Sequence, residues 1–177
     1  MPELEAAGID VPGPLVVTLC TGNAARSVMA GAMLAGAGVR VATAGTHVVE
    51  GQPMSRRTRD ALDAVGVRAD GHRSHQVTPD DLERADVVVA MATEHVAFVR
   101  RRHPEAAPRT ATIRRLVRDL PSGPGTLADR LAALDLAAVE LEPWEDVADP
   151  AGGEDEHYVA CATTLFGLTT ALVPLLG

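Results

Sequence analysis

The fold is decided by one short stretch, Cys20-Thr21-Gly22-Asn23-Ala24-Ala25-Arg26-Ser27. An apolar run at residues 15–19 precedes it and predicts a buried parallel strand. Residues 28–35 follow it and predict the first turns of a helix. The stretch is therefore a turn from a strand into a helix, and the turn contains a thiol, a glycine and an arginine.

The residue types in this turn indicate a site for an oxyanion. Successive backbone N–H groups in such a turn can bind an anion, and the helix dipole adds partial positive charge. The same field favours the thiolate form of Cys20, and the planar guanidinium of Arg26 can hold two phosphate oxygens. A thiolate beneath an anion cradle is suited to attack on phosphorus. The alternative is a buried, inert cysteine before an ordinary helix N-terminus.

The rest of the chain alternates between strand and helix patterns, which predicts an α/β fold with a parallel sheet covered on both faces. Residues 1–13 are expected to be a flexible leader, and residues 14–177 a single domain. The further strands are expected at 39–44, 86–91 and 110–113. The further helices are expected at 55–65, from 78 to before 85, at 93–102, after 127, and from 154 to about 176.

Composition narrows the functional class. Hydrophobic residues make up 46% of the 177 residues and charged residues 23%, as in soluble globular proteins. The net charge of −8 argues against nucleic-acid binding and against a basic membrane patch. We expect no run of membrane-spanning length, no signal peptide and no metal-ligand spacing of the two cysteines. Cytoplasmic localisation is therefore expected, with no metal or cofactor.

The stretch from Cys20 to Ser27 resembles the phosphate-binding loop (P-loop) of the low-molecular-weight protein tyrosine phosphatase family, C-x-G-N-x-x-R-S. Residues 146–150, Asp-Val-Ala-Asp-Pro, resemble that family's general-acid loop. By our reading the resemblance covers about residues 14–176. It implies a three-layer sandwich around a four-stranded parallel sheet with strand order 2-1-3-4.

The resemblance also implies a role for each matching residue. Cys20 would be the nucleophile, Asp149 the general acid and then base, and Ser27 a hydrogen-bond donor to the thiolate. Asn23 would hold the loop in shape, and His72 would support it. Asp146 is the rival acid, although the Asp-Pro step favours Asp149. The phosphate-binding residues would be Thr21, Gly22, Asn23, Ala24, Ala25 and Arg26.

These matches predict a cysteine-dependent phosphatase that acts on phosphorylated protein, first of all on phosphotyrosine, or on a small phosphorylated or oxyanion substrate. Two alternatives stay open. An arsenate reductase would need an external thiol, because Cys161 is the only spare cysteine and has no cysteine near it in the sequence. Ala25 replaces the family's second loop cysteine, so a protective disulfide with Cys20 cannot form there. A weakly active phosphate-binding or interaction module is the other, because Ala151-Gly152 replaces the aromatic residue after the Asp-Pro step.

Overall fold

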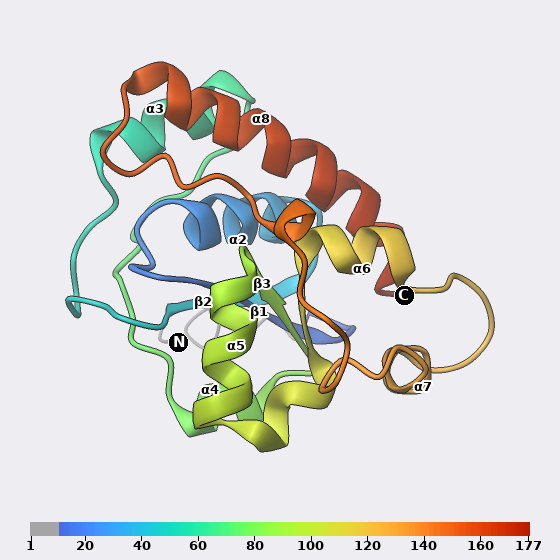
Figure 1. Cartoon of the computed structure of the whole chain (residues 1–177). Coiled ribbons are helices and arrows are strands. Elements are labelled where there is room, and N and C mark those ends of the chain that lie inside the picture. The colour runs from blue at the N-terminus through green and yellow to red at the C-terminus, as the bar shows by residue number, and fades with distance from the viewer. Residues whose placement is uncertain (1–10) are drawn as a thin grey trace.

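The computed structural model describes residues 11–177 and is built on one parallel sheet (Figure 1). The sheet has the order β2-β1-β3-β4, as expected. Cys20 at the end of β1 pairs with Gly45 of β2, and Leu19 pairs with Ala90 of β3. This register brings the carboxyl ends of the first three strands to one edge of the sheet. The strands are β1 (Leu15–Cys20), β2 (Arg40–Gly45), β3 (Val87–Ala90) and β4 (Thr110–Thr112).

Helices cover both faces of this sheet. Successive side chains of β1 point to opposite faces, so β1 contributes to one apolar cluster on each face. Val16 and Cys20 belong to the larger apolar cluster, which also contains residues of α2, α3, α6 and α8. Val17 and Leu19 belong to a second cluster with residues of α4 and α5. The helices are α2 (Arg26–Gly36), α3 (Arg56–Ala64), α4 (Pro79–Arg84), α5 (Thr93–Arg102), α6 (Ile113–Asp119), α7 (Leu127–Ala132) and α8 (Asp155–Leu172). Short 3-10 helices are η1 (Pro104–Arg109), η2 (Pro143–Glu145) and η3 (Val173–Leu175).

Helix starts follow from capping chemistry in the sequence. The Ser55 side chain accepts a hydrogen bond from the backbone N–H of Thr58 and begins α3. Thr78 and Asp81 form a reciprocal capping box at the start of α4. The sequence did not predict α6, which begins immediately after β4, with Thr112 as both the last strand residue and the N-cap.

Helix α8 lies diagonally across one face of the molecule, over α2, α3 and α6 (Figure 1). Together with η3 it forms a 21-residue segment that is long and apolar enough to cross a membrane by length and composition. This segment differs from the expectation of no run of membrane-spanning length. One helix of this kind is weak support for a membrane span, because the core helix of a soluble protein passes the same test. Its inner side chains, Cys161, Ala162, Leu165 and Leu172, are buried in the core of this domain.

The division into a leader and one domain stays a prediction. Of the expected leader, residues 1–10 lie outside the described residues. The described chain begins at Val11, and the Gly13 carbonyl accepts a hydrogen bond from Arg40 at 3.0 Å.

Candidate active site

The loop from Cys20 to Ser27 joins β1 to α2 at the carboxyl edge of the sheet, as the sequence predicts. It is held against the end of β2 by two backbone hydrogen bonds of 2.9 Å, from Thr46 to the Cys20 carbonyl and from His47 to the Thr21 carbonyl. Gly45 permits this approach, because a Cβ there would collide with the Thr21 carbonyl oxygen and with the Val48 side chain. The end of β2 and the two residues that follow it therefore support the loop.

The backbone N–H groups of the loop are available to a ligand. Within residues 11–177, no hydrogen bond uses the amide nitrogen of any residue from Thr21 to Ser27. Arg26 begins α2, so these donors also lie at the positive end of a helix dipole. A series of unpaired amides at a helix N-terminus is the arrangement that binds phosphate in proteins.

A buried hydrogen-bond chain orients the hydroxyl of Ser27 toward the sulfur of Cys20. The Asn23 Oδ1 atom accepts from the His75 backbone N–H at 3.0 Å, which fixes the orientation of the Asn23 amide group. Asn23 Nδ2 therefore donates to Ser27 Oγ at 2.9 Å. The Ser27 hydroxyl hydrogen is then free to point at Cys20 Sγ, 2.9 Å away. A thiolate at Cys20 would be stabilised by this donor.

Asn23 adopts a left-handed backbone conformation within the loop. Its φ of 49° is left-handed, a conformation that asparagine tolerates better than most residues. The His72 imidazole contacts the Asn23 carbonyl oxygen at 3.0 Å. The Thr58 hydroxyl of α3 donates to the Ala24 carbonyl at 3.1 Å. The loop is thus supported from two segments that lie far away in the sequence.

Arg26 joins the loop to the segment that contains Asp149. One nitrogen of its guanidinium donates to the Val147 carbonyl at 3.0 Å, and the other lies 3.3 Å from Asp149 Oδ2. Asp149 therefore lies beside the loop, although it is more than a hundred residues further on in the sequence. Asp146 has a different position: its Oδ1 atom accepts from the Thr93 backbone N–H at 2.7 Å and so caps α5.

Two further side chains, Glu94 and His95, contact the loop, although no pattern in the sequence assigns them a role. The Thr21 hydroxyl donates to Glu94 Oε1 at 3.2 Å and lies 2.9 Å from His95 Nε2. His95 Nδ1 accepts from the Ala92 backbone N–H at 3.0 Å, so a neutral His95 carries its proton on Nε2 and donates it to Thr21. Both residues lie in the first helical turn after β3. Because ligands bind at the carboxyl ends of parallel strands, this position could have identified them as candidate site residues.

His95 is neutral in this environment. Burial is the largest cause and lowers its pKa to about 3, and the positive charge of Arg26 acts in the same direction. The carboxylates of Asp149 and Asp146 act in the opposite direction and do not outweigh burial. His95 therefore serves as a hydrogen-bond donor of fixed tautomer rather than as an acid or base near neutral pH.

A buried ion pair anchors the acid-bearing segment. Arg115 of α6 contacts both oxygens of Glu145, at 2.6 and 3.1 Å, and the Thr112 hydroxyl donates to the same carboxylate at 2.8 Å. Burial alone would raise the pKa of Glu145, but the hydrogen bonds from Arg115, the Glu142 backbone and Thr112 lower it below its usual value. Glu145 thus fixes the start of the segment that ends at Asp149.

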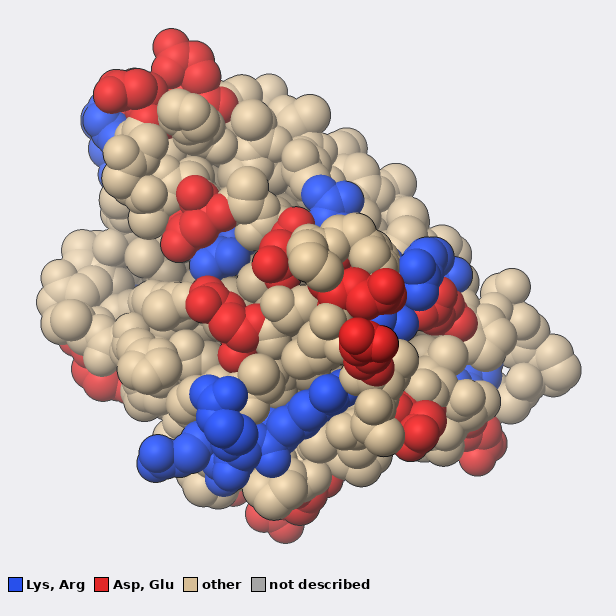
Figure 2. Space-filling view, viewed as in Figure 1, with Lys and Arg blue, Asp and Glu red and all other residues tan. Residues whose placement is uncertain are grey.

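The rim of the loop is rich in carboxylates. The side chains of Glu94 and Asp149 are 67% and 49% exposed, and both lie within 4.0 Å of Arg26. Figure 2 shows acidic residues over the upper end of α5 and along the segment before α8, and basic residues gathered at the lower end of α5. The last turn of α5 contains Arg100, Arg101 and Arg102. The two segments beside the loop, 47–50 and 149–152, contain no Phe, Tyr or Trp.

Cys161 is buried on α8 as a free thiol. Burial raises its pKa to about 11, although the positive charge of Arg26 acts the other way. It is therefore protonated near neutral pH. Within residues 11–177, no group of three or more His, Cys, Asp or Glu side chains could hold a metal ion.

Comparison with known proteins identifies the family. A model of the low molecular weight phosphotyrosine protein phosphatases matches residues 15–129. A protein-arginine-phosphatase of Geobacillus stearothermophilus is 32% identical over 153 residues, which are 85% of this chain and 87% of that protein. The solved YwlE arginine phosphatase of the same organism has a TM-score of 0.72, with 31% identity and 90% of each chain covered.

A third relative extends the match to another solved enzyme. The low molecular weight protein tyrosine phosphatase from T. tengcongensis has a TM-score of 0.71 at 29% identity and covers 90% of this chain and 97% of its own. The matched region contains the whole loop from Cys20 to Ser27. The chain belongs to the low molecular weight phosphotyrosine protein phosphatase family.

Proposed function

We propose that this phosphatase works through a phosphocysteine intermediate on Cys20. The observation that carries the proposal is the joint placement of three groups around one loop. Cys20 Sγ lies 2.9 Å from Ser27 Oγ, the loop amides are unpaired within the described chain, and Arg26 links the loop to Asp149 at 3.3 Å. A nucleophile, an oxyanion cradle and a proton donor are thus within reach of one phosphoryl group.

The reaction follows in two steps. The Cys20 thiolate attacks phosphorus, the bond from phosphorus to the leaving group breaks, and Asp149 gives its proton to the leaving atom. Asp149, now a carboxylate, takes a proton from water as the water attacks the phosphocysteine. The sulfur leaves as a thiolate that the Ser27 hydroxyl stabilises, and inorganic phosphate is released. Arg26 and the loop amides stabilise the equatorial oxygens in both transition states.

Phosphotyrosine in a protein is the first substrate candidate, on the strength of family membership. The acidic rim favours phosphoarginine as a second candidate. A phosphorylated guanidinium carries positive charge beside phosphorus, which the Glu94 carboxylate would attract, whereas an aromatic ring would find no ring to stack on at 151–152. A relative that bears the name protein-arginine-phosphatase is consistent with this candidate.

Arsenate reduction with an external thiol is the alternative activity of the same anion loop. Cys161 is buried and protonated near neutral pH and so is a poor partner for thiol exchange, which is why this activity would depend on an external thiol. We keep cytoplasmic localisation and a phosphorylated protein partner as part of the proposal. Two free cysteines fit a reducing compartment.

The deciding experiment is a comparison of rates for the wild type and Cys20→Ser. We expect the wild type to hydrolyse p-nitrophenyl phosphate and Cys20→Ser to bind phosphate without turnover. Rapid quenching should trap phosphate on Cys20, identified by mass spectrometry. Equal rates for the two proteins, or turnover without labelled Cys20, would exclude the mechanism. A wild type that binds phosphate but never turns over would favour the phosphate-binding module.

Substrate choice needs a second measurement on the wild type. Peptides of one sequence that contain phosphotyrosine, phosphoserine or phosphoarginine, together with arsenate plus a thiol donor, should be compared by kcat/KM. A clear preference for phosphoarginine would replace our first candidate by the second. Consumption of thiol on addition of arsenate, without peptide hydrolysis, would favour the reductase.

A further inference from the structure

Helix α8 has apolar side chains on two opposite faces. Leu165 and Leu172 are buried in the core, whereas Val159 and Phe166 are 38% and 44% exposed. None of the side chains from 158 to 177 is charged. Only 28% of an 18-residue stretch of this apolar segment is buried. A surface helix normally has one apolar and one polar face, so the outer face of α8 indicates a contact surface.

The outer face of α8 has a regular pattern, which we call the α8 seam. It consists of Val159, Thr163, Phe166, Thr170 and Val173, which recur at alternating steps of four and three residues. The first four are exposed and the last is partly buried. Residues at this spacing share one side of a helix, and it is the spacing along which two helices pack side by side. The α8 seam therefore fits another helix.

The two threonines of the α8 seam use their hydroxyl hydrogens within the helix. Thr163 Oγ1 donates to the Val159 carbonyl at 2.9 Å, and Thr170 Oγ1 donates to the Phe166 carbonyl at 2.7 Å. A hydroxyl that is already bonded to its own helix loses little when water is removed from it. The α8 seam can therefore be covered without leaving a donor unpaired.

The α8 seam has the same order of residue types in both directions: Val, Thr, Phe, Thr, Val. In an antiparallel pair with a two-fold axis at Phe166, Val159 would meet Val173 of the second copy. Thr163 would meet Thr170 of the second copy, and Phe166 would meet its own counterpart. An interface between identical subunits requires this kind of self-complementarity. The pattern therefore favours a second copy of this chain over an unrelated helix.

The charges beside the α8 seam are complementary in the same orientation. Asp155 and Glu156 lie in the first turn of α8, and α6, with Arg114 and Arg118, lies beside its second half (Figure 1). Figure 2 shows acidic residues at the upper end of α8, basic residues beside its lower half, and an uncharged surface between them. An antiparallel pair brings each acidic end toward the arginines of the other copy, whereas a parallel pair would bring the two acidic ends together.

We propose that the α8 seam is the interface of a homodimer, in which two copies of this chain pack antiparallel about a two-fold axis at Phe166. The seam is roughly 21 Å long and about one helix diameter wide, which is less than the ~800 Å² per partner of a standard interface. We therefore expect a weak dimer, with a dissociation constant on the order of 10–100 μM.

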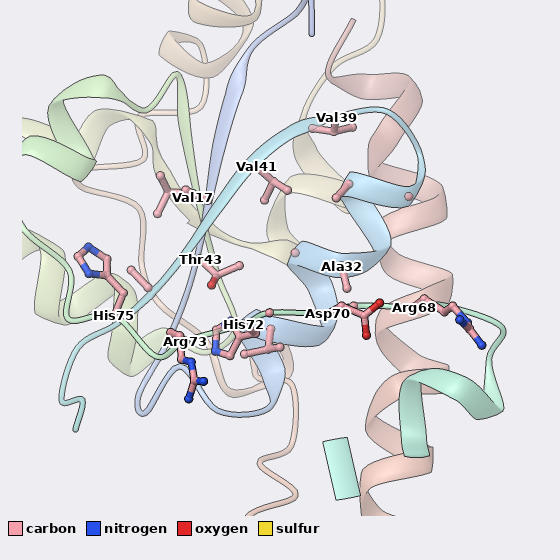
Figure 3. Close-up of a pocket in the computed structure, with 18 of the residues that line it drawn as sticks. Val17, Ala32, Val39, Val41, Thr43, Arg68, Asp70, His72, Arg73 and His75 are labelled. Carbon is pink, nitrogen blue, oxygen red and sulfur yellow. The ribbon is translucent and has the colours of Figure 1, made fainter. Parts of the chain in front are cut away.

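Both active sites would stay open in this dimer. The side-chain hydrogen bonds and ion pairs of the catalytic loop within residues 11–177 involve no residue of the α8 seam. A groove of about 620 Å³ beside β2 would also stay outside the interface, because its described lining residues include none of α8 (Figure 3). The proposal is independent of the substrate and of the phosphocysteine mechanism.

Sedimentation equilibrium of the full chain tests the proposal, and we expect the wild type to pass from monomer to dimer between about 1 μM and 1 mM. Phe166→Glu and Phe166→Arg should each stay monomeric, because the two-fold axis places like charges against each other. An equimolar mixture of the two variants should form a dimer again. The matched control is Val49→Glu, which changes another exposed apolar side chain outside α8 and should leave the dimer unchanged.

Disulfide formation tests the orientation of the two helices. Val159→Cys and Val173→Cys should cross-link when the two variants are mixed and mildly oxidised, because the antiparallel pair brings these positions together. Neither variant should cross-link through this position by itself. Peptide mass spectrometry identifies the bond.

Four results would overturn the proposal. A wild type that stays monomeric up to about 1 mM would show that the α8 seam does not bind a second copy. A dimer that persists in both Phe166 variants would place the interface elsewhere. Cross-links formed by each cysteine variant alone, but not between them, would indicate a parallel pair. A monomer that binds phosphatidylcholine vesicles in the wild type but not in Phe166→Glu would assign the face to a membrane surface.

Discussion

The nucleophile loop at 20–27 and the acid segment at 146–153 serve one reaction but are held in different ways. Asn23 and Ser27 are completely buried, and side chains or backbone from β2, α3 and residues 72–75 hold the loop. The acid segment is fixed up to Val147, which donates to the Met91 carbonyl at 2.8 Å. Beyond that point Asp149 is half exposed, and among residues 11–177 only Arg26 holds its side chain from outside the segment.

This difference suits the two chemical roles. A sulfur nucleophile must meet phosphorus in a fixed line, so a rigid loop lowers the cost of reaching the transition state. The acid must exchange partners, because a phosphate dianion bound at Arg26 competes with the Asp149 carboxylate for the same guanidinium. A lightly held side chain can make that exchange at little cost. Mutations in the nucleophile loop should therefore reduce the free energy of unfolding, whereas mutation of Asp149 should reduce proton transfer to the leaving group.

The largest effect is expected from Asn23→Ala. This change removes the hydrogen bonds to Ser27 Oγ and to the His75 backbone and leaves both partners buried. We expect the free energy of unfolding to fall by about 3 kcal/mol. We expect kcat/KM for p-nitrophenyl phosphate to fall on the order of 100- to 1,000-fold, since a displacement of about 1 Å at a reacting centre can cost that much.

Ser74→Ala is the matched control for this loop. Ser74 is also buried, donates to the Val49 carbonyl at 2.6 Å and accepts from the Gln52 backbone N–H at 2.8 Å. It should lose similar stability in urea unfolding and keep most of its activity. If Ser74→Ala lost as much activity as Asn23→Ala, the loop would have no special need for rigidity.

Asp149→Asn should have the next largest effect, and only on catalysis. Its ion pair is half exposed and contributes roughly 0–1 kcal/mol to stability. We expect hydrolysis of phenyl phosphate to slow about 100-fold or more, because its leaving oxygen needs a proton, and hydrolysis of p-nitrophenyl phosphate to slow much less.

Asp146→Asn is the control for the acid. The asparagine keeps an oxygen that can cap α5 at Thr93. Asp146→Asn should therefore change little the ratio of the rates on phenyl phosphate and p-nitrophenyl phosphate. Equal rate losses on both substrates in Asp149→Asn would show that Asp149 is not the general acid. A larger loss on phenyl phosphate in Asp146→Asn would assign that role to Asp146.

The sequence predicted the parts of the molecule that depend on local chemistry. The strand-to-helix turn at Cys20 and the helices expected from 55 and from 78 are determined by neighbouring residues, and the structure begins α3 and α4 at caps on Ser55 and Thr78. Helix α6 was missed because β4 has only three residues and no glycine or proline separates it from the helix. The helix itself has only seven residues, too few to show a helical period.

The missed parts of the site depend on contacts between residues far apart in the chain. Thr21 and His95 are separated by 74 positions, and Thr112 and Glu145 by 33. Neither pair belongs to a motif, and each residue has an ordinary explanation as a helix residue or a turn residue. Asp149 could be placed only through the family resemblance, since an Asp-Pro step by itself predicts no more than a turn.

His95 allows a pH test of the rigid region. Its pKa is about 3 when folded and near 6.5 when unfolded, so the unfolded chain binds more protons between these values. The contribution of neutral His95 to the free energy of unfolding should therefore be fully present above about pH 6.5 and should decrease as the pH falls toward 3. We expect a loss of roughly 3 kcal/mol between neutral pH and pH 4 in urea unfolding, and a smaller loss in His95→Asn.

His157→Asn is a close control, because His157 Nδ1 accepts from the Glu154 backbone N–H at 2.8 Å at the start of α8, just as His95 does at the start of α5. His157 is exposed, so its replacement should leave the pH dependence of the wild type unchanged. An identical pH dependence in wild type and His95→Asn would show that other groups cause the loss.

The smallest effect is expected at the second sulfur. Cys20 lies under unpaired amides beside Arg26, whereas Cys161 is buried among apolar side chains that raise its pKa to about 11. Near neutral pH, iodoacetamide should therefore modify Cys20 and leave Cys161 unmodified, as read by peptide mass spectrometry. Cys161→Ala should keep kcat/KM within about twofold and lose about 1 kcal/mol of stability through a small cavity. A variant that retained phosphatase activity but lost thiol-dependent arsenate reduction would show instead that Cys161 exchanges electrons with Cys20. The two sulfurs would then act as a pair, and the fixed loop would have a redox function besides phosphate transfer.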